Sequence, residues 1–148
     1  MAGDRFVYVT YIRTTPAALW QALIDPDFTR RYWLGVRHEA DWRVGGAWKL
    51  ILPDGTVGDT GEVVEFDPPK RLALRWRNEF RPELKAEGES RCTMELEPAE
   101  DAVKLTVTHS IDREDSKFIA AVSGGWPKIL SNLKSLLETG SVVVTQYR

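Results

Sequence analysis

The chain has 148 residues, of which 43% are hydrophobic and 28% charged, and its net charge is −2. This length fits one domain over residues 1–148, which at about 150 residues buries roughly 68–70% of its unfolded surface and folds without disulfides or metals. One cysteine and two histidines exclude a disulfide framework and argue against a metal site, and the mild acidity argues against nucleic acid as a partner.

The N-terminal part of the chain predicts one strand followed by two short helices. Residues 6–13 are β-branched and aromatic, which is typical of a strand. Thr15 and Pro16 suit the cap and the first turn of a helix, so we expect a helix over residues 16–24. After an Asp-Pro-Asp break, a second short helix is expected over residues 27–33.

Residues 36–109 predict about six strands separated by turns. Each strand alternates apolar and polar residues, which is typical of an antiparallel sheet with one solvated face. The alternation places His38 and His109 on the inward side. It also puts Glu62 and Glu65 on opposite faces of one strand, so one of them is a candidate for a buried carboxylate, although a solvent-facing salt bridge is the more common outcome and is favoured here.

The C-terminal part predicts a long amphipathic helix. Apolar residues recur every three or four positions over residues 118–137, and Gly140 is expected to end the helix. Pro127 interrupts the pattern, so the helix is either kinked there or begins near Gly124 and Gly125.

The predicted order is strand, two short helices, about six strands and one long helix. A β-branched tail over residues 141–147 fits a short strand or an ordered extension. This order predicts an α+β fold in which a curved antiparallel sheet of six or seven strands wraps around the C-terminal helix. Such a sheet cannot pack closely along the whole helix, so we expect a cavity between them, and cavities of this kind are common ligand sites.

Six sequence blocks that follow one another along nearly the whole chain are LWQALIDPDFTRRYW (19–33), DWRVGGAWKL (41–50), GEVVEFDPPKRLALRW (61–76), SRCTMELEP (90–98), LTVTH (105–109) and GGWPKILSNLKSLLETG (124–140). Together they resemble the SRPBCC (START-like, helix-grip) superfamily and, more closely, the homologues of the activator of heat-shock-protein-90 ATPase. The resemblance implies a helix-grip fold with an internal, largely apolar cavity. The superfamily includes lipid carriers, polyketide cyclases, hormone receptors and chaperone regulators, and the fold alone does not select among them.

The six tryptophans exceed what a core of this size needs. They either fill the core or line the cavity, where indole offers a stacking surface and one N–H donor. We favour Trp33, Trp76 and Trp126 as lining because they come from three different elements. The full set of candidate cavity residues is Trp33, His38, Trp48, Trp76, Met94, His109, Val122, Trp126 and Leu130.

No catalytic set is visible. A histidine can act as a general acid or base near neutral pH, but neither His38 nor His109 has a nearby serine or cysteine in the sequence to serve as nucleophile. We therefore interpret both as core or rim histidines. Cys92 lies on an inward register and is interpreted as an inert core thiol.

These patterns predict a protein that binds a small hydrophobic or aromatic molecule under the C-terminal helix, without a cofactor. The resemblance implies an alternative, a stress-response regulator with a chaperone as partner. A cyclase or hydrolase is third and requires polar groups such as His38, His109 or Glu65 to converge in the cavity. The chain shows no secretory signal and no run of about 20 apolar residues, so we expect a cytoplasmic protein without membrane insertion. A homodimer is left open.

Overall fold

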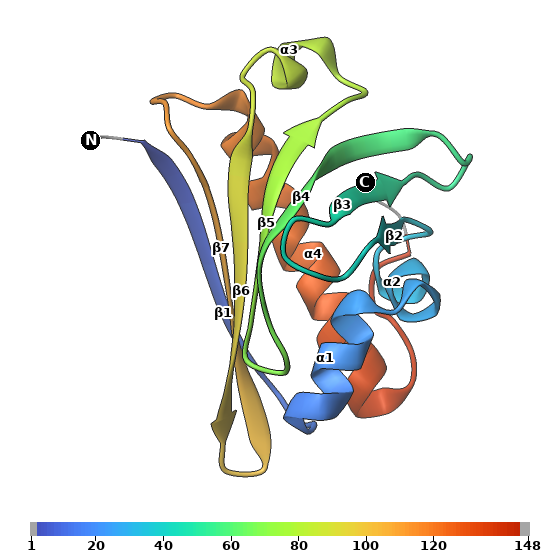
Figure 1. The fold of residues 1–148 in the computed structure, drawn as a ribbon. Coiled ribbons are helices and arrows are strands. Elements are labelled where there is room, and N and C mark those ends of the chain that lie inside the picture. The colour runs from blue at the N-terminus through green and yellow to red at the C-terminus, as the bar shows by residue number, and fades with distance from the viewer. Residues whose placement is uncertain (1–2, 146–148) are drawn as a thin grey trace.

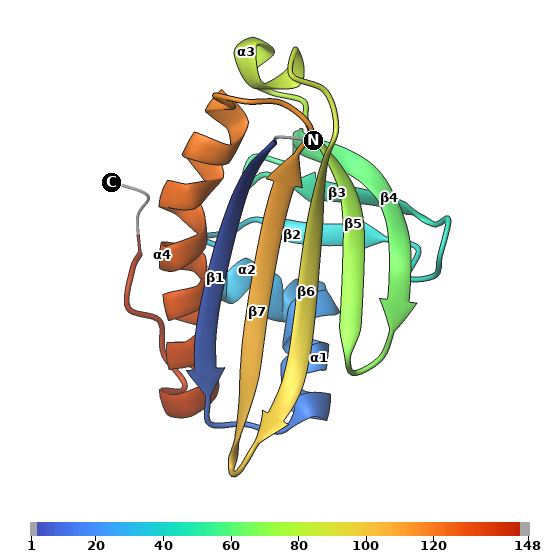
Figure 2. The same cartoon turned by 90° about the vertical axis from the view of Figure 1, so that its left-hand side faces the viewer.

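A curved antiparallel sheet of seven strands packs on the C-terminal helix in the computed structural model, which describes residues 3–145. The elements are β1 (Asp4–Ile12), α1 (Pro16–Ile24), α2 (Pro26–Tyr32), β2 (Arg37–Ala40), β3 (Ala47–Ile51), β4 (Val57–Asp67), β5 (Arg71–Asn78), α3 (Pro82–Lys85), β6 (Ser90–Ala99), β7 (Ala102–Ile111) and α4 (Lys117–Thr139). The strand order is β1-β7-β6-β5-β4-β3-β2, so β2 to β7 form a meander and β1 joins its last strand. Figure 1 shows α1, α2 and α4 on one side of the sheet, and Figure 2 shows the opposite face. The predicted α+β helix-grip fold is confirmed.

The two short helices begin where side chains cap them. Thr15 Oγ1 accepts a hydrogen bond from the Ala18 amide at 3.2 Å, and α1 has the predicted bounds. Asp25 Oδ1 accepts from the Asp27 amide at 2.8 Å, so α2 begins one residue earlier than predicted. Trp33 is consequently the residue that ends α2, and it turns out of the helix toward the sheet.

The helix α4 is continuous from Lys117 to Thr139 and includes Pro127. Ser116 Oγ caps it by accepting from the Ile119 amide at 3.0 Å. The predicted alternative start near residues 124–125 is therefore wrong, because the capping contact fixes the beginning two turns earlier. Gly140 ends the helix in the left-handed conformation, with φ of 88°, as predicted.

The tail after α4 contains no strand over residues 141–145. The buried Asn132 holds it instead, accepting at Oδ1 from the amides of Val143 and Val144 at 2.9 and 2.7 Å. The last part of the predicted tail strand, residues 146 and 147, lies outside the described residues.

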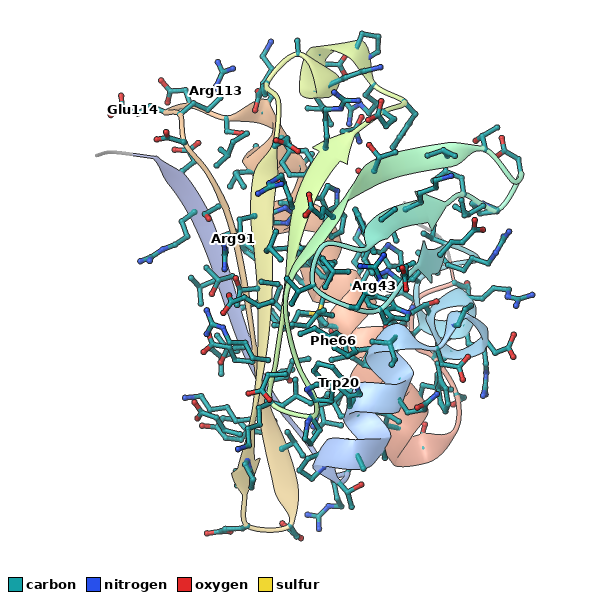
Figure 3. All side chains as sticks on the ribbon, viewed as in Figure 1. Trp20, Arg43, Phe66, Arg91, Arg113 and Glu114 are labelled. Carbon is teal, nitrogen blue, oxygen red and sulfur yellow. The ribbon has the colours of Figure 1, made fainter. Side chains whose placement is uncertain are left out.

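A β-bulge in β4 changes which way its glutamates point. The register with β5 shifts between Val63 and Glu65, so Glu62 and Glu65 lie on the same outer face. Glu62 pairs there with Arg75 at 3.0 Å, and Glu65 pairs with Arg71 at 3.1 Å and with Arg91, labelled in Figure 3. Neither glutamate points inward, and the solvent-facing salt bridge, which the sequence favoured, is confirmed.

The inner face of the sheet and the facing helix sides form one apolar core. Four of the six tryptophans are at most 5% exposed, namely Trp33, Trp48, Trp76 and Trp126. Trp20 of α1 packs edge-on against Phe66 of β4, with ring centroids 5.5 Å apart, and both side chains are labelled in Figure 3. Within residues 3–145, no helix is long and apolar enough to cross a bilayer.

Candidate functional site

A pocket of about 620 Å³ lies under the first half of α4. Its walls come from the end of α2, from β3, β4 and β5, from α3 and from α4. It opens between α3 and α4, where the lining residues Phe80, Ala121 and Gly124 are exposed. The short helix α3, which the sequence pattern did not predict, therefore forms part of the pocket mouth.

Three tryptophans from different elements form the inner wall of this pocket. The ring centroid of Trp33 lies 6.2 Å from that of Trp76 and 5.2 Å from that of Trp126, and the last two rings are 6.0 Å apart. All three residues line the pocket but are almost fully buried. They therefore offer ring surface to a ligand while remaining part of the core.

A buried carboxylate lies next to this wall. Asp59 of β4 is 6% exposed and lines the pocket. Its Oδ2 accepts hydrogen bonds from Trp76 Nε1 at 2.7 Å and from Asn78 Nδ2 at 3.4 Å. Burial raises the pKa of Asp59 to about 6, against the opposing effect of these two hydrogen bonds. Its other oxygen, Oδ1, receives no hydrogen bond from the residues that the structure describes.

His109 accepts the indole N–H of another wall residue. Trp126 Nε1 donates to His109 Nδ1 at 3.1 Å, so the ring proton is on Nε2, which lies 2.9 Å from Ser90 Oγ. Ser90 Oγ in turn donates to the Trp76 carbonyl oxygen at 3.2 Å. Burial lowers the pKa of His109 to about 3, so the ring is neutral and both of its nitrogens are used within the core.

His38 has the same role on the other side of the core. Trp48 Nε1 donates to His38 Nδ1 at 2.9 Å, and both side chains are buried. Burial lowers the pKa of His38 to about 3. Both histidines thus serve as hydrogen-bond acceptors for tryptophan rings, and neither presents a free base to the pocket.

The family of the chain follows from its sequence match. Residues 13–138 match the family model described as Activator of Hsp90 ATPase homolog 1-like protein. The chain belongs to this family. This confirms the resemblance inferred from the six sequence blocks. No match was found among curated proteins.

Several solved structures share the fold of this chain. A protein from Mesorhizobium loti has a TM-score of 0.79 and 23% identity, covering 94% of this chain and 100% of its own. The Aha1 dimer from Colwellia psychrerythraea has a TM-score of 0.75 and 22% identity, with coverages of 93% and 98%. An Hsp90 activator from Plasmodium falciparum has a TM-score of 0.73 and 24% identity, with coverages of 90% and 95%. At these identities the likeness concerns the fold alone.

Of the nine candidate cavity residues in this family member, four line the pocket: Trp33, Trp76, Val122 and Trp126. The other five lie in the core instead, because the sheet packs closely on the helix away from the pocket: His38, Trp48, Met94, His109 and Leu130. The polar set named for a cyclase or hydrolase does not converge, since both histidines are bound in the core and Glu65 is on the outer face.

Asp59, Asn78 and Phe80 are pocket residues that the sequence reasoning missed. β4 begins at Val57, so Asp59 and Gly61 lie in the same strand as Glu62 and Glu65. Extending the alternation backward from Gly61 would have placed Asp59 on the inner face. Among residues 3–145, no three His, Cys, Asp or Glu side chains are grouped so that they could hold a metal ion.

Proposed function

We propose that the protein binds a small, largely apolar molecule in the pocket under α4. The observation that carries the proposal is the pocket itself, whose volume of about 620 Å³ falls within the range of about 300–1,000 Å³ that is typical of small-molecule sites. Its wall combines aromatic surface from Trp33, Trp76 and Trp126 with one buried carboxylate, Asp59. Few polar groups among many apolar ones is the usual composition of such sites.

The two glycines of α4 support this proposal. Gly124 and Gly125 lie inside the helix and line the pocket. A glycine in a helix interior destabilises it by about 0.5–1 kcal/mol relative to alanine. A Cβ at either position would meet no atom within 4 Å, so packing does not require glycine there. Because they carry no side chain, the two glycines leave volume free in the pocket next to the helix backbone.

The test combines ligand screening with a variant that fills the pocket. Fluorescence and thermal shift are recorded for a panel of aromatic and aliphatic molecules, because three tryptophans on the wall report on binding. Gly125→Leu is expected to abolish the responses of molecules that bind the wild type, since its side chain occupies the empty space at this position. Gly125→Ala is the matched control and is expected to keep them. A panel without any response, or one that Gly125→Leu leaves unchanged, would contradict the proposal.

A role as chaperone partner is the second candidate, and the family match favours it. One structural neighbour is described as an Hsp90 activator and another as a dimer. The test measures the ATPase rate of an Hsp90-type chaperone with and without the protein, alongside the molecular mass of the protein in solution. Stimulation that Gly125→Leu does not change would assign this activity to a surface separate from the pocket. No change in ATPase rate and no co-purification would exclude it.

A further inference from the structure

We propose that Asp59 makes the pocket selective for ring-bearing apolar molecules that carry a neutral hydroxyl, which donates a hydrogen bond to Asp59 Oδ1. This inference rests on the proposed ligand-binding function and adds the chemical class of the ligand.

The first argument is the unequal use of the two carboxylate oxygens. Oδ2 accepts from both Trp76 and Asn78, whereas Oδ1 has no donor among residues 3–145. The Asp59 side chain is more than nine-tenths buried and lines the pocket. No side-chain oxygen of the described residues is both buried and without a hydrogen-bond partner, so Oδ1 is accessible from the pocket. A ligand donor placed in the pocket can therefore bond to it.

The second argument is that the neighbouring groups are fixed. The Arg81 amide donates to Asn78 Oδ1 at 2.9 Å, so the Nδ2 group of Asn78 is turned toward Asp59. Trp76 Nε1 is held by the packed wall of three indoles. Because both donors reach only Oδ2, rotation of the carboxylate would exchange one oxygen for the other and still leave one open to the pocket.

The third argument is that the indole N–H of Trp76 does not require a charged acceptor. Trp48 and Trp126 each donate to a neutral histidine nitrogen, so an uncharged acceptor satisfies an indole N–H in this core. Burying a carboxylate is more costly than burying a neutral acceptor. No cation offsets this cost among the causes that act on the pKa of Asp59, because the charged neighbour among them is Glu79, which raises it.

The occupant is a hydroxyl rather than an ammonium group. Most of the pocket wall is made of apolar rings and aliphatic side chains, and two cations, Arg81 and Lys128, also line it. A further full positive charge there carries a desolvation penalty and is repelled by these cations. A hydroxyl donates one hydrogen bond to the carboxylate at a smaller penalty. The stacked indoles favour a flat ring as the carrier of that hydroxyl.

The substitution Asp59→Asn is expected to invert the preference for a ligand that donates a hydrogen bond. The amide oxygen of this asparagine must face Trp76 Nε1 and Asn78 Nδ2, because an NH₂ group there would oppose two donors. The NH₂ group then takes the place of Oδ1 and points to the pocket. Asp59→Asn therefore replaces an acceptor by a donor at the same place and with nearly the same shape.

The experiment measures binding of 2-naphthol and 2-methoxynaphthalene by calorimetry, at a pH well above the pKa of Asp59. The two probes share the ring and the oxygen, but only the first can donate. Wild type is expected to bind 2-naphthol about 10-fold more tightly, the value of one charge-assisted hydrogen bond. In Asp59→Asn this preference is expected to disappear or reverse. Glu62→Gln, which removes a carboxylate from the outer face of the same strand, is expected to keep it.

The outcomes separate the two proposals. If both probes bind wild type equally, the selectivity inference is overturned while ligand binding stands. If neither probe binds, ligand binding by aromatic molecules is overturned and the inference with it. The wild-type ratio alone decides the inference even where Asp59→Asn does not fold, and the fold of that variant is checked by its tryptophan fluorescence and melting temperature.

Discussion

Three tryptophans of this protein donate to buried acceptors, Trp48, Trp76 and Trp126. Two of these pairs differ in the hydrogen bonds that the acceptor makes in addition. In the pair Trp126–His109, the ring donates a hydrogen bond from Nε2 to Ser90 Oγ, and Ser90 donates to a backbone carbonyl oxygen. In the pair Trp76–Asp59, the carboxylate accepts at one oxygen and leaves the other facing the pocket. We call them the closed pair and the open pair.

The difference separates a hydrogen bond that lies wholly in the core from one at the edge of the pocket. A buried indole N–H needs an acceptor, and both pairs supply one. The closed pair uses every polar atom inside the protein, so it can only stabilise the core. In the open pair, Asp59 Oδ1 accepts no hydrogen bond from the described residues, and it lies where the core adjoins the pocket. The two pairs should therefore differ in three measurable ways: the stability lost on substitution, the pH dependence of stability, and the effect on ligand preference.

Truncating the closed pair is the largest expected effect. His109→Ala removes a fully buried ring and leaves Trp126 Nε1 without its acceptor. The lost packing and the unpaired donor together lower the free energy of unfolding by about 3–4 kcal/mol. Urea denaturation measures this loss. In the open pair, Asp59→Asn keeps an oxygen facing Trp76 and is expected to change stability by less than about 1 kcal/mol. Equal losses of unfolding free energy in the two variants would contradict the distinction between the closed pair and the open pair.

Acid is expected to act on the two kinds of pair with opposite sign. Burial lowers the pKa of His38 and His109 to about 3, below the unfolded value of 6.5. Between about pH 7 and pH 5 the unfolded state binds protons that the folded histidines do not, so each histidine removes about 2 kcal/mol of stability. The pKa of Asp59 is raised to about 6 from 3.8. The folded state therefore gains a proton there first, which adds about 1 kcal/mol of stability over the same range.

The expected net effect is a loss of about 2–3 kcal/mol between about pH 7 and pH 5, measured by urea denaturation at each pH. Asp59→Asn lacks the compensating proton, so its loss should be larger by about 1 kcal/mol. Glu79, whose pKa is lowered to about 2 mainly by a hydrogen bond from Thr60, contributes only at lower pH. An identical pH dependence in wild type and Asp59→Asn would show that the open pair does not take up a proton in this range.

Most elements of the fold could be predicted from local signals. Thr15 and Pro16 predicted the bounds of α1, and apolar spacing with Gly140 predicted the end of α4. The inward registers of both histidines were also readable, since alternation along a strand determines its faces. Their partners were not, because each histidine accepts from a tryptophan 10 or 17 residues away on another element.

The pocket was harder to predict than the sheet. Asp59 follows Gly58 in a polar stretch that looks like a turn, and only its pairing with β3 and β5 extends the strand through it. The bulge near Val63 likewise depends on the partner strand and not on local sequence, and it placed both glutamates outside. Residues whose position is set by cross-strand register are the ones that pattern reading misses.

Ligand preference is expected to follow the protonation of the open pair. When Asp59 is protonated, Oδ2 still accepts from Trp76, so the proton resides on Oδ1 and donates into the pocket. The preference of wild type for 2-naphthol over 2-methoxynaphthalene should fall from about 10-fold above pH 7 to near unity at about pH 5. Calorimetry at both pH values measures the ratio.

Other charged groups near Asp59 need a control in this measurement. Glu79 lies close enough to raise the pKa of Asp59, and Arg81 and Lys128 line the pocket. Asp59→Asn keeps all three, so a ratio that still depends on pH in this variant would assign the effect to them and not to Asp59. If the ratio of the two probe affinities changes with pH in wild type but not in Asp59→Asn, the proton responsible is bound by Asp59.

The smallest expected effect comes from the outer face of the same strand. Glu62→Gln removes a carboxylate three residues along β4 from Asp59, but Glu62 is half-exposed and paired with Arg75. An exposed ion pair of this kind contributes about 0–1 kcal/mol, and Arg75 keeps Glu89 as a second partner at 4.0 Å. Urea denaturation should give a change of less than about 0.5 kcal/mol, with neither the acid dependence nor the probe ratio altered. A larger shift in either would mean that the charge of β4 as a whole, and not the placement of Asp59 inside it, governs the pocket.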